Sequence, residues 1–211
     1  MSDTGRDARS FDEVFDTQTA FRALLMAMAR PGRIEWLPWP VTEVPAGLSE
    51  AYALTLMTLL DHEVSFCLAG TGDSGGEVEK WVVMRTGCKP AAPEEADFIL
   101  VLEGDSKRCL SRAKQGTPEF PDRGATAVYQ VAGLRSGQTS GTESGMTVRL
   151  MGPGVDGSRC ITVYGLGSGE MDDIRSTRRD YPVGVDVILV SRQGEVACLP
   201  RSTLVTFLDE A

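Results

Sequence analysis

The chain has 211 residues, of which 42% are hydrophobic, and its formal net charge is −9 at pH 7. The length is typical of one globular domain, and the acidic balance argues against a nucleic-acid partner, which would need a basic surface. We also expect no membrane partner, because no apolar run approaches the roughly 20 residues that a spanning helix needs. Residues 1–9 are polar and no apolar signal-peptide core follows them, so a cytoplasmic location is expected. A short basic cluster at Arg175, Arg178 and Arg179 lies among aspartates.

Cysteine and histidine usage gives no sign of a metal site or of a disulfide framework. The five cysteines are Cys67, Cys88, Cys109, Cys160 and Cys198. Their number is odd and no two of them form a Cys-x-x-Cys pair, which favours reduced, buried thiols. The single histidine is His62, and a zinc site would need these scattered residues to converge. We therefore predict no metal and no cofactor.

The first expected helix follows a disordered N-terminus at residues 1–10. Asp16 is a candidate N-cap for this helix, which would run over about 17–30. Arg30 would lie in its last turn, and Pro31-Gly32 would end it. The apolar side chains expected to share one face of this helix are Phe21, Leu24, Leu25 and Met28.

The rest of the first half alternates between expected strands and helices. Ser49 is a candidate cap for a helix over 51–60, whose apolar residues lie nearly all round it and predict burial on more than one side. The segment 97–103 is the strongest expected strand. Its apolar run is unbroken, which is typical of a strand buried on both faces at the centre of a sheet. The other expected elements of this half are strands at 33–37 and 64–69 and helices at 77–85 and 106–114.

Expected strands cluster in the second half of the chain. A β-hairpin is predicted from strands at 185–190 and 195–199, and a Gly/Ser/Thr-rich segment at 136–145 predicts a mobile hairpin tip. The other expected elements are strands at 125–131, 147–151, 160–164 and 204–208 and a polar helix near 171–179. Together the elements predict an α/β fold with a mixed sheet flanked by helices, in a single domain over residues 11–211.

The loop from Gly116 to Gly124 precedes the expected strand at 125–131. Its two prolines lack a backbone donor and bias the residues before them to extended conformations, so the loop is expected to be stiff. It carries Glu119, Asp122 and Arg123, which a stiff loop could present to a partner or a ligand. The alternative is a plain connection between two elements.

The segment Gly70-Thr-Gly-Asp-Ser-Gly-Gly76 fits two functional patterns. It matches Gly-x-Gly-x-x-Gly between a strand and a helix, with Glu103 as a candidate ribose acceptor. This gives the alternative hypothesis of a stand-alone nucleotide-dependent enzyme, although acidic residues at the helix start would repel a pyrophosphate. Ser74 also stands in a sequence typical of a serine-hydrolase nucleophile, for which His62 is the only histidine base. An ordinary surface loop is the third interpretation, and a second glycine match at 152–157 predicts a turn.

Six separated stretches, in their order and spacing, carry a family resemblance that spans nearly the whole chain after residue 11. They lie at 15–32, 54–61, 116–126, 150–155, 182–189 and 199–203, and include Ala-Arg-Pro-Gly32, Gly116-Thr-Pro-Glu-Phe-Pro-Asp-Arg-Gly124 and Leu199-Pro-Arg-Ser-Thr203. This set resembles the PhnH family of the bacterial carbon–phosphorus lyase system for phosphonate use. The segment 70–76 is not part of the family pattern.

The resemblance implies a fold similar to the large domain of pyridoxal-phosphate-dependent transferases, without the cofactor or its lysine. It also implies a homodimer and a core complex with PhnG, PhnI and PhnJ. With PhnG, PhnI and PhnL, the family takes part in a transfer in which a phosphonate oxygen displaces adenine from the ribose anomeric carbon of ATP (ribose 1-methylphosphonate 5-triphosphate synthase). The family has no established catalytic residues to carry over, so a structural subunit is expected.

We expect contacts to a partner subunit or to substrate phosphates in three segments of this pattern. Arginine suits both tasks because its planar guanidinium presents several donors. The candidate contact residues are Arg30, Gly116, Thr117, Arg123, Arg201 and Ser202. The alternative is that Arg30 and Arg201 only close the ends of a helix and a strand. No catalytic, metal-binding or cofactor-binding residue is predicted.

Overall fold

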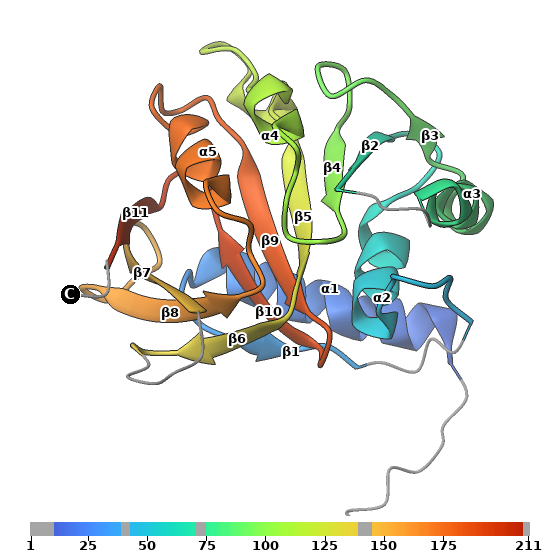
Figure 1. Ribbon diagram of the computed structural model, residues 1–211, viewed down its shortest axis with the longest axis horizontal. Coiled ribbons are helices and arrows are strands. Elements are labelled where there is room, and N and C mark those ends of the chain that lie inside the picture. The colour runs from blue at the N-terminus through green and yellow to red at the C-terminus, as the bar shows by residue number, and fades with distance from the viewer. Residues whose placement is uncertain (1–10, 39–42, 71–74, 139–144, 209–211) are drawn as a thin grey trace, which may run out of the picture.

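The computed structural model describes residues 11–38, 43–70, 75–138 and 145–208 (Figure 1). Its larger sheet has seven strands in the order β1-β10-β9-β5-β4-β2-β3. Neighbours from β9 to β3 are parallel, whereas β10 is antiparallel to both β9 and β1. The strands are β1 (Glu35–Trp36), β2 (Ser65–Ala69), β3 (Lys89–Pro90), β4 (Phe98–Val101), β5 (Thr126–Val131), β9 (Asp186–Ser191) and β10 (Glu195–Leu199). The predicted mixed α/β fold and the β9–β10 hairpin are confirmed.

Helices cover both faces of the larger sheet. Helices α1, α2 and α3 pack on the face that carries Leu100, Val128 and Ile188. The opposite face, with Ile99 and Ala127, packs against α4, α5 and a second sheet (Figure 1). The helices are α1 (Glu13–Ala29), α2 (Glu50–Leu59), α3 (Gly75–Thr86), α4 (Cys109–Arg112) and α5 (Glu170–Ser176), with a 3₁₀ turn at Pro121–Arg123. Within the described ranges, no helix is both long enough and apolar enough to cross a bilayer.

The smaller sheet is antiparallel throughout, in the order β11-β7-β8-β6. Its strands are β6 (Gly133–Ser136), β7 (Gly145–Met151), β8 (Arg159–Tyr164) and β11 (Leu204–Phe207). The sequence predicted three of these strands within one mixed sheet, and the structure separates them into a sheet of their own. The strand β6 was not predicted, because a four-residue segment that begins with glycine gives only a weak strand signal. The glycine match at 152–157 forms the predicted turn between β7 and β8.

The start of α1 corrects the sequence interpretation. Asp12 is the N-cap, and its Oδ1 accepts hydrogen bonds from the backbone N–H groups of Val14 and Phe15 at 3.1 and 3.0 Å. Asp16 is instead buried in the first turn, where its Oδ2 accepts from the Asp12 backbone N–H at 2.8 Å. The two aspartates therefore cap the helix reciprocally. By contrast, Ser49 caps α2 as predicted, with its Oγ accepting from the Tyr52 backbone N–H at 3.3 Å.

The buried face of α1 also differs from the predicted one. The helix packs against α2 and β10 through Ala20, Leu24 and Ala27, where the two alanines let the backbones approach closely. Phe21 and Leu25 are consequently exposed. The exposed large apolar side chains of this helix, which we call the α1 surface, are Val14 (74%), Phe15 (63%), Phe21 (47%), Leu25 (52%) and Met26 (41%).

Two helix boundaries and the centre of the larger sheet also differ from the sequence prediction. The helix expected at 106–114 is reduced to α4, because Lys107 and Arg108 have positive φ angles of 50° and 65°. The strand β4 is interior as expected, but β5 holds the central position of the sheet. The helix α5 ends at Ser176, so Arg178 and Arg179 lie in the irregular segment beyond it. The expected disorder at 1–10 and most of the expected hairpin tip at 136–145 lie outside the described residues.

Candidate functional site

Arg201 links three segments of the chain at the end of the larger sheet where the interior strand β9 begins. Its backbone N–H donates to Asp186 Oδ1 at 2.7 Å, and its Nη2 donates to Asp186 Oδ2 at 2.5 Å. Its Nη1 donates to the carbonyl oxygen of Pro121 in the 116–124 loop. The side chains of Arg201 and Asp186 are only 14% and 23% exposed. The turn after β10 is thereby fixed both to β9 and to the loop that the sequence singled out.

The 116–124 loop is held by its own backbone. The backbones of Thr117 and Phe120 exchange hydrogen bonds of 3.2 and 3.0 Å. Gly116 has a φ of +79°, and a Cβ there would lie 2.8 Å from the Phe120 carbonyl oxygen, so the turn requires glycine. Arg123 lies over the Phe120 ring, with its Cζ 4.5 Å from the ring centroid, and both residues are exposed. Gly116 and Thr117 therefore shape the loop, and Arg123 lies at its surface.

Arg30 lies apart from this cluster, exposed at the C-cap of α1. The turn between β7 and β8 packs between the end of α1 and the 200–203 turn. A Cβ on Gly154 would collide with the Ala29 carbonyl oxygen, and one on Gly152 would lie 3.0 Å from the Ser202 carbonyl oxygen. Within the described ranges, no hydrogen bond or ion pair joins Arg30 to the 116–124 loop or to the 200–203 turn.

A cleft of about 380 Å³ opens beside Arg201, and we call it the arginine cleft. Two short segments form it. One is 175–181, which runs from the end of α5 onward, and the other is 201–205, which runs from the turn after β10 into β11. Its polar lining consists of Arg175, Arg178, Arg179, Arg201, Ser202 and Thr203. Arg201 and Ser202 were candidates from the sequence, whereas the other arginines were noted only as a basic cluster among aspartates. That cluster was the available signal, but the sequence does not show that it folds against the 200–203 turn.

Arg178 is half-buried as a residue, but two of its three guanidinium nitrogens are fully buried. Its Nη2 donates to the Leu199 carbonyl oxygen at 2.6 Å, while its Nε and Nη1 are buried without a hydrogen-bond partner among the described residues. The Oγ1 of Thr203 is buried in the same condition. Burial lowers the pKa of Arg178 to about 10, with Asp186 acting to raise it and Arg201 to lower it further. The guanidinium therefore stays charged at neutral pH despite its burial.

The acidic groups around the cleft are largely committed to other partners. Asp186 is held by Arg201 through both of its oxygens. Asp172 lies 3.4 Å from Arg175 in an exposed pair, which solvent screens strongly. Arg179 is exposed and forms no ion pair in the described part of the chain. The residues that line the cleft therefore include four arginines and no acidic residue, although the chain as a whole is acidic.

A buried network behind the cleft fixes the start of α5. Glu170 is 3% exposed, and its Oε1 accepts from the backbone N–H and the Oγ of Ser106 at 2.8 and 2.9 Å. Its Oε2 accepts from the Tyr129 hydroxyl at 2.6 Å. Burial and the neighbouring Glu170 carboxylate raise the pKa of Tyr129 well above its ordinary value. Through Tyr129, the central strand β5 therefore holds the helix that leads into the arginine segment.

A second hollow of about 770 Å³ adjoins the arginine cleft and shares Arg175 with it. Its lining comes from the start of β7, the loop between β8 and α5, the helix α5 and the end of β11. Phe207 closes one side, with the Arg175 guanidinium 5.6 Å from its ring centroid. This hollow offers few charged groups, so it is less suited to a charged ligand than the arginine cleft.

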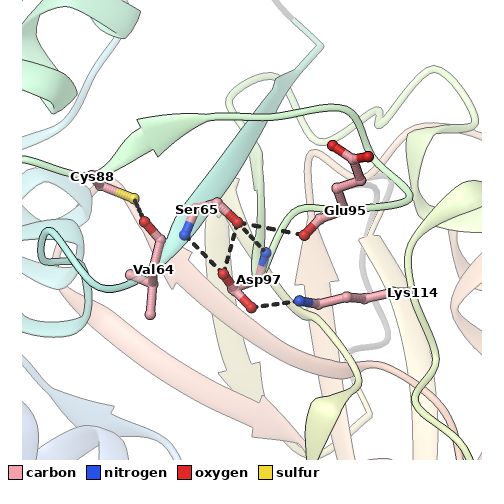
Figure 2. Close-up of polar contacts among 6 residues, drawn as sticks. All are labelled: Val64, Ser65, Cys88, Glu95, Asp97 and Lys114. Carbon is pink, nitrogen blue, oxygen red and sulfur yellow. Dashed lines mark hydrogen bonds and ion pairs between the residues drawn. The ribbon is translucent and has the colours of Figure 1, made fainter.

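A polar cluster at the start of β2 and β4 has a structural role (Figure 2). Asp97 Oδ2 accepts from the backbone N–H and the Oγ of Ser65 at 2.8 and 2.7 Å, and its Oδ1 accepts from Lys114 Nζ at 2.5 Å. Burial acts to raise the pKa of Asp97, but the hydrogen bonds from Lys114 and Ser65 outweigh it and the pKa is lowered. Cys88 also contributes, because its Sγ donates to the Val64 carbonyl oxygen at 3.1 Å.

The glycine motif at 70–76 lies only partly within the described residues, since 71–74, with Ser74, fall outside them. Gly70 has a φ of +66°, and a Cβ there would collide with the Asp105 carbonyl oxygen. This glycine is therefore required by a close approach to protein backbone rather than to a phosphate. His62 is exposed after α2, and within the described ranges no group of three or more His, Cys, Asp or Glu side chains could hold a metal ion.

Comparison with known proteins gives consistent matches. Residues 9–206 match a family described as "Bacterial phosphonate metabolism protein (PhnH)". The chain is 32% identical to "Alpha-D-ribose 1-methylphosphonate 5-triphosphate synthase subunit PhnH" of Rhizobium meliloti over 193 residues, which cover 91% of each protein. It is 35% identical to "Putative C-P lyase subunit protein HtxG" of Stutzerimonas stutzeri over 187 residues, which cover 88% of this chain and 84% of that protein.

Proposed function

Because the chain belongs to the PhnH family of bacterial phosphonate metabolism proteins, we propose that it is a subunit of the carbon–phosphorus lyase machinery. Its task there is to support the synthesis of α-D-ribose 1-methylphosphonate 5-triphosphate, in which a phosphonate oxygen displaces adenine from the ribose anomeric carbon of ATP. The observation that carries this proposal is the likeness to a named subunit of that synthase over 91% of both chains.

We assign the chain a binding and assembly role rather than an acid–base role. The two most extensively hydrogen-bonded carboxylates described above serve structural contacts: Glu170 holds Tyr129 and Ser106, and Asp97 holds Ser65 and Lys114. The expected likeness of the larger sheet to pyridoxal-phosphate-dependent transferases stays a prediction. So does the cytoplasmic location, which suits a reaction that consumes ATP.

We propose PhnG, PhnI and PhnJ as stable partners, PhnL as a further partner, and a homodimer for the isolated chain. The α1 surface supports partner contacts, because five large apolar side chains exposed on one helix are typical of a protein interface. The exposed Arg123–Phe120 pair adds two residue types that are enriched at protein interfaces. Arg30, Gly116 and Thr117 remain candidate contact residues, and Arg201 and Ser202 are assigned to the arginine cleft.

The alternative of a stand-alone nucleotide-dependent enzyme is not supported. Both relatives are named as subunits, and Gly70 serves a backbone contact with Asp105.

The test is co-expression of the tagged chain with PhnG, PhnI and PhnJ, followed by the mass of the purified assembly. We expect one hetero-oligomer that contains all four proteins. If PhnG, PhnI and PhnJ assemble while this chain purifies alone, the proposed function is wrong.

A further inference from the structure

We propose that the arginine cleft binds a phosphate-type oxyanion, supplied by the triphosphate or the phosphonate group of a substrate, with Arg178, Arg179 and Thr203 contacting it. This inference deepens the proposed function by naming the ligand class of one surface, and its biological meaning rests on that function.

Buried polar atoms of the cleft lack hydrogen-bond partners among the described residues. Buried polar groups in proteins are nearly always hydrogen-bonded, so each exception needs an explanation. Here three atoms in two neighbouring lining residues are exceptions: Nε and Nη1 of Arg178 and Oγ1 of Thr203. Leaving a charged donor buried and unpaired costs stability. A tetrahedral oxyanion against Arg178 would supply several acceptors and remove this cost.

The lining of the cleft is rich in positively charged side chains. Four guanidinium groups line it, and Arg201 already uses both oxygens of Asp186. The other acids of this segment are Asp172 and Asp180, which are exposed, and Asp173, which is half-buried. Asp172 faces Arg175 at 3.4 Å. Arg178 and Arg179 therefore have no carboxylate hydrogen-bonded to them in the described part of the chain. Guanidinium groups match phosphate oxygens in geometry and charge, and such hydrogen bonds are among the strongest in proteins.

Hydrogen bonds hold both walls of the cleft in place. Arg201 is fixed by Asp186 and by the Pro121 carbonyl oxygen, so it positions the 200–203 turn rather than contacting ligand with all its donors. On the other wall, Glu170 fixes the start of α5 through Tyr129 and Ser106. Fixed donors lose little conformational freedom when a ligand binds, which favours affinity. The volume of about 380 Å³ lies in the range of small-ligand sites.

The test is calorimetric titration of the full chain with tripolyphosphate and with methylphosphonate at constant ionic strength. We expect at least one of the two anions to bind the wild-type chain. Arg178→Met should weaken that binding by about tenfold or more, because it removes charge-assisted hydrogen bonds. Arg192→Ala is the matched control, since Arg192 is exposed in the turn at the opposite end of β9 and its loss removes the same charge. Its affinity should equal that of the wild type.

Arg178→Met should fold, because it removes an unpaired buried charge, and thermal unfolding checks this. Thr203→Val provides a second variant of nearly unchanged volume, with an expected loss of about threefold or more in affinity. Binding of tripolyphosphate alone assigns the triphosphate to the cleft, and binding of methylphosphonate alone assigns the phosphonate. Either result supports the proposal.

The proposal is overturned if the wild-type chain binds neither anion, or if Arg178→Met and Thr203→Val both bind as well as the wild type. Equal weakening by Arg192→Ala would also overturn it, because it would indicate attraction by net charge alone. The outcome is separate from the proposed function: a wild-type chain that binds tripolyphosphate but does not co-purify with PhnG, PhnI and PhnJ refutes the subunit role and leaves the anion site standing. Loss of co-purification on Arg178→Met without anion binding by the wild type would make the cleft a subunit contact.

Discussion

Arg201 and Arg178 both lie near the carboxylate of Asp186, but only Arg201 is hydrogen-bonded to it. Arg201 holds Asp186 through side chain and backbone, whereas Arg178 bonds only the Leu199 carbonyl oxygen through its side chain. The sequence identified Arg201 as a candidate, because it stands in a pattern of family resemblance. It could not identify Arg178, because the residue's lack of a partner depends on Asp186 being already occupied. That is a property of three-dimensional contacts between segments distant in the sequence.

Asp97 allows a prediction of pH dependence at the same scale. Its pKa is lowered in the folded chain, so its contribution to stability is present above its ordinary pKa of 3.8 and is lost as the pH falls through the lower folded value. We expect Asp97→Asn to lower the free energy of unfolding at pH 7 by about 1 kcal/mol or less, because the side chain is 38% exposed and solvent screens its pairing. Urea unfolding at pH 7 and below pH 4 measures the difference.

The difference between wild type and Asp97→Asn should shrink as the pH falls below about 4, because Asp97 then becomes protonated in the unfolded chain while the folded chain still holds it ionised, and it should vanish below the lowered folded pKa. Glu95→Gln is the control, since Glu95 is exposed and contacts Ser65 through its backbone carbonyl oxygen rather than its carboxylate. A difference that is the same at both pH values would contradict the assignment.

At the scale of single elements, local signals predicted some helix starts and missed others. Ser49 was identified because a helix cap and a buried apolar helix coincide at α2. For α1, Asp16 was predicted as the N-cap, but the helix begins earlier, after Asp12. The predicted face of α1 was right for Leu24 and Met28 and wrong for Phe21 and Leu25. The helix is rotated toward Ala20 and Ala27, which pack closely against α2 and β10 but carry little weight in a hydrophobic pattern. The helix predicted at 106–114 was too long, because nothing in the sequence indicates that Lys107 and Arg108 have left-handed backbone conformations.

The reciprocal cap of α1 gives a prediction for this element. Asp12→Ala should lower the free energy of unfolding by about 1 kcal/mol, because the backbone N–H groups of Val14 and Phe15 lose their acceptor. Chemical denaturation followed by circular dichroism measures this change. Asp12→Asn keeps a capping oxygen and should retain most of the stability. Equal losses in both variants would show that Asp12 acts through charge and not as a cap.

At the scale of the whole molecule, the order of strands was beyond prediction. The sequence indicates that strands and helices alternate and then that strands cluster, but each strand after β5 could join either sheet. The assignment is made by side chains such as Val148 and Ile161, which pack against the face of the larger sheet opposite α1. The same arrangement brings the 175–181 and 201–205 segments together and so creates the arginine cleft, which no local pattern indicates.

The α1 surface gives a prediction about assembly. Replacing Phe21 and Leu25 together by serine should weaken association, either of two copies of this chain or of this chain with its partner subunits, because it removes two exposed apolar side chains from one face. Sedimentation velocity of the isolated chain and co-purification of the complex measure the two kinds of association. We expect at least one of them to fall while the melting temperature changes little.

Met84→Ser is the control for this double variant, because Met84 is 81% exposed on another helix, α3. It should leave association unchanged. If neither assay responds to the double variant, or if Met84→Ser has the same effect, the α1 surface is not the interface.

The strand order also bears on how the chain folds as the ribosome makes it. β1, near the start of the sequence, pairs with β10, and the edge of β5 is completed by β9, so both wait for residues beyond 185. Until those residues have left the exit tunnel, a strand edge and the sheet-facing side of α1 stay open to other chains. The larger sheet therefore cannot be completed before the chain has been made through β10. A nascent chain that stalls before β9 would be a substrate for chaperones and proteases rather than a stable half-domain.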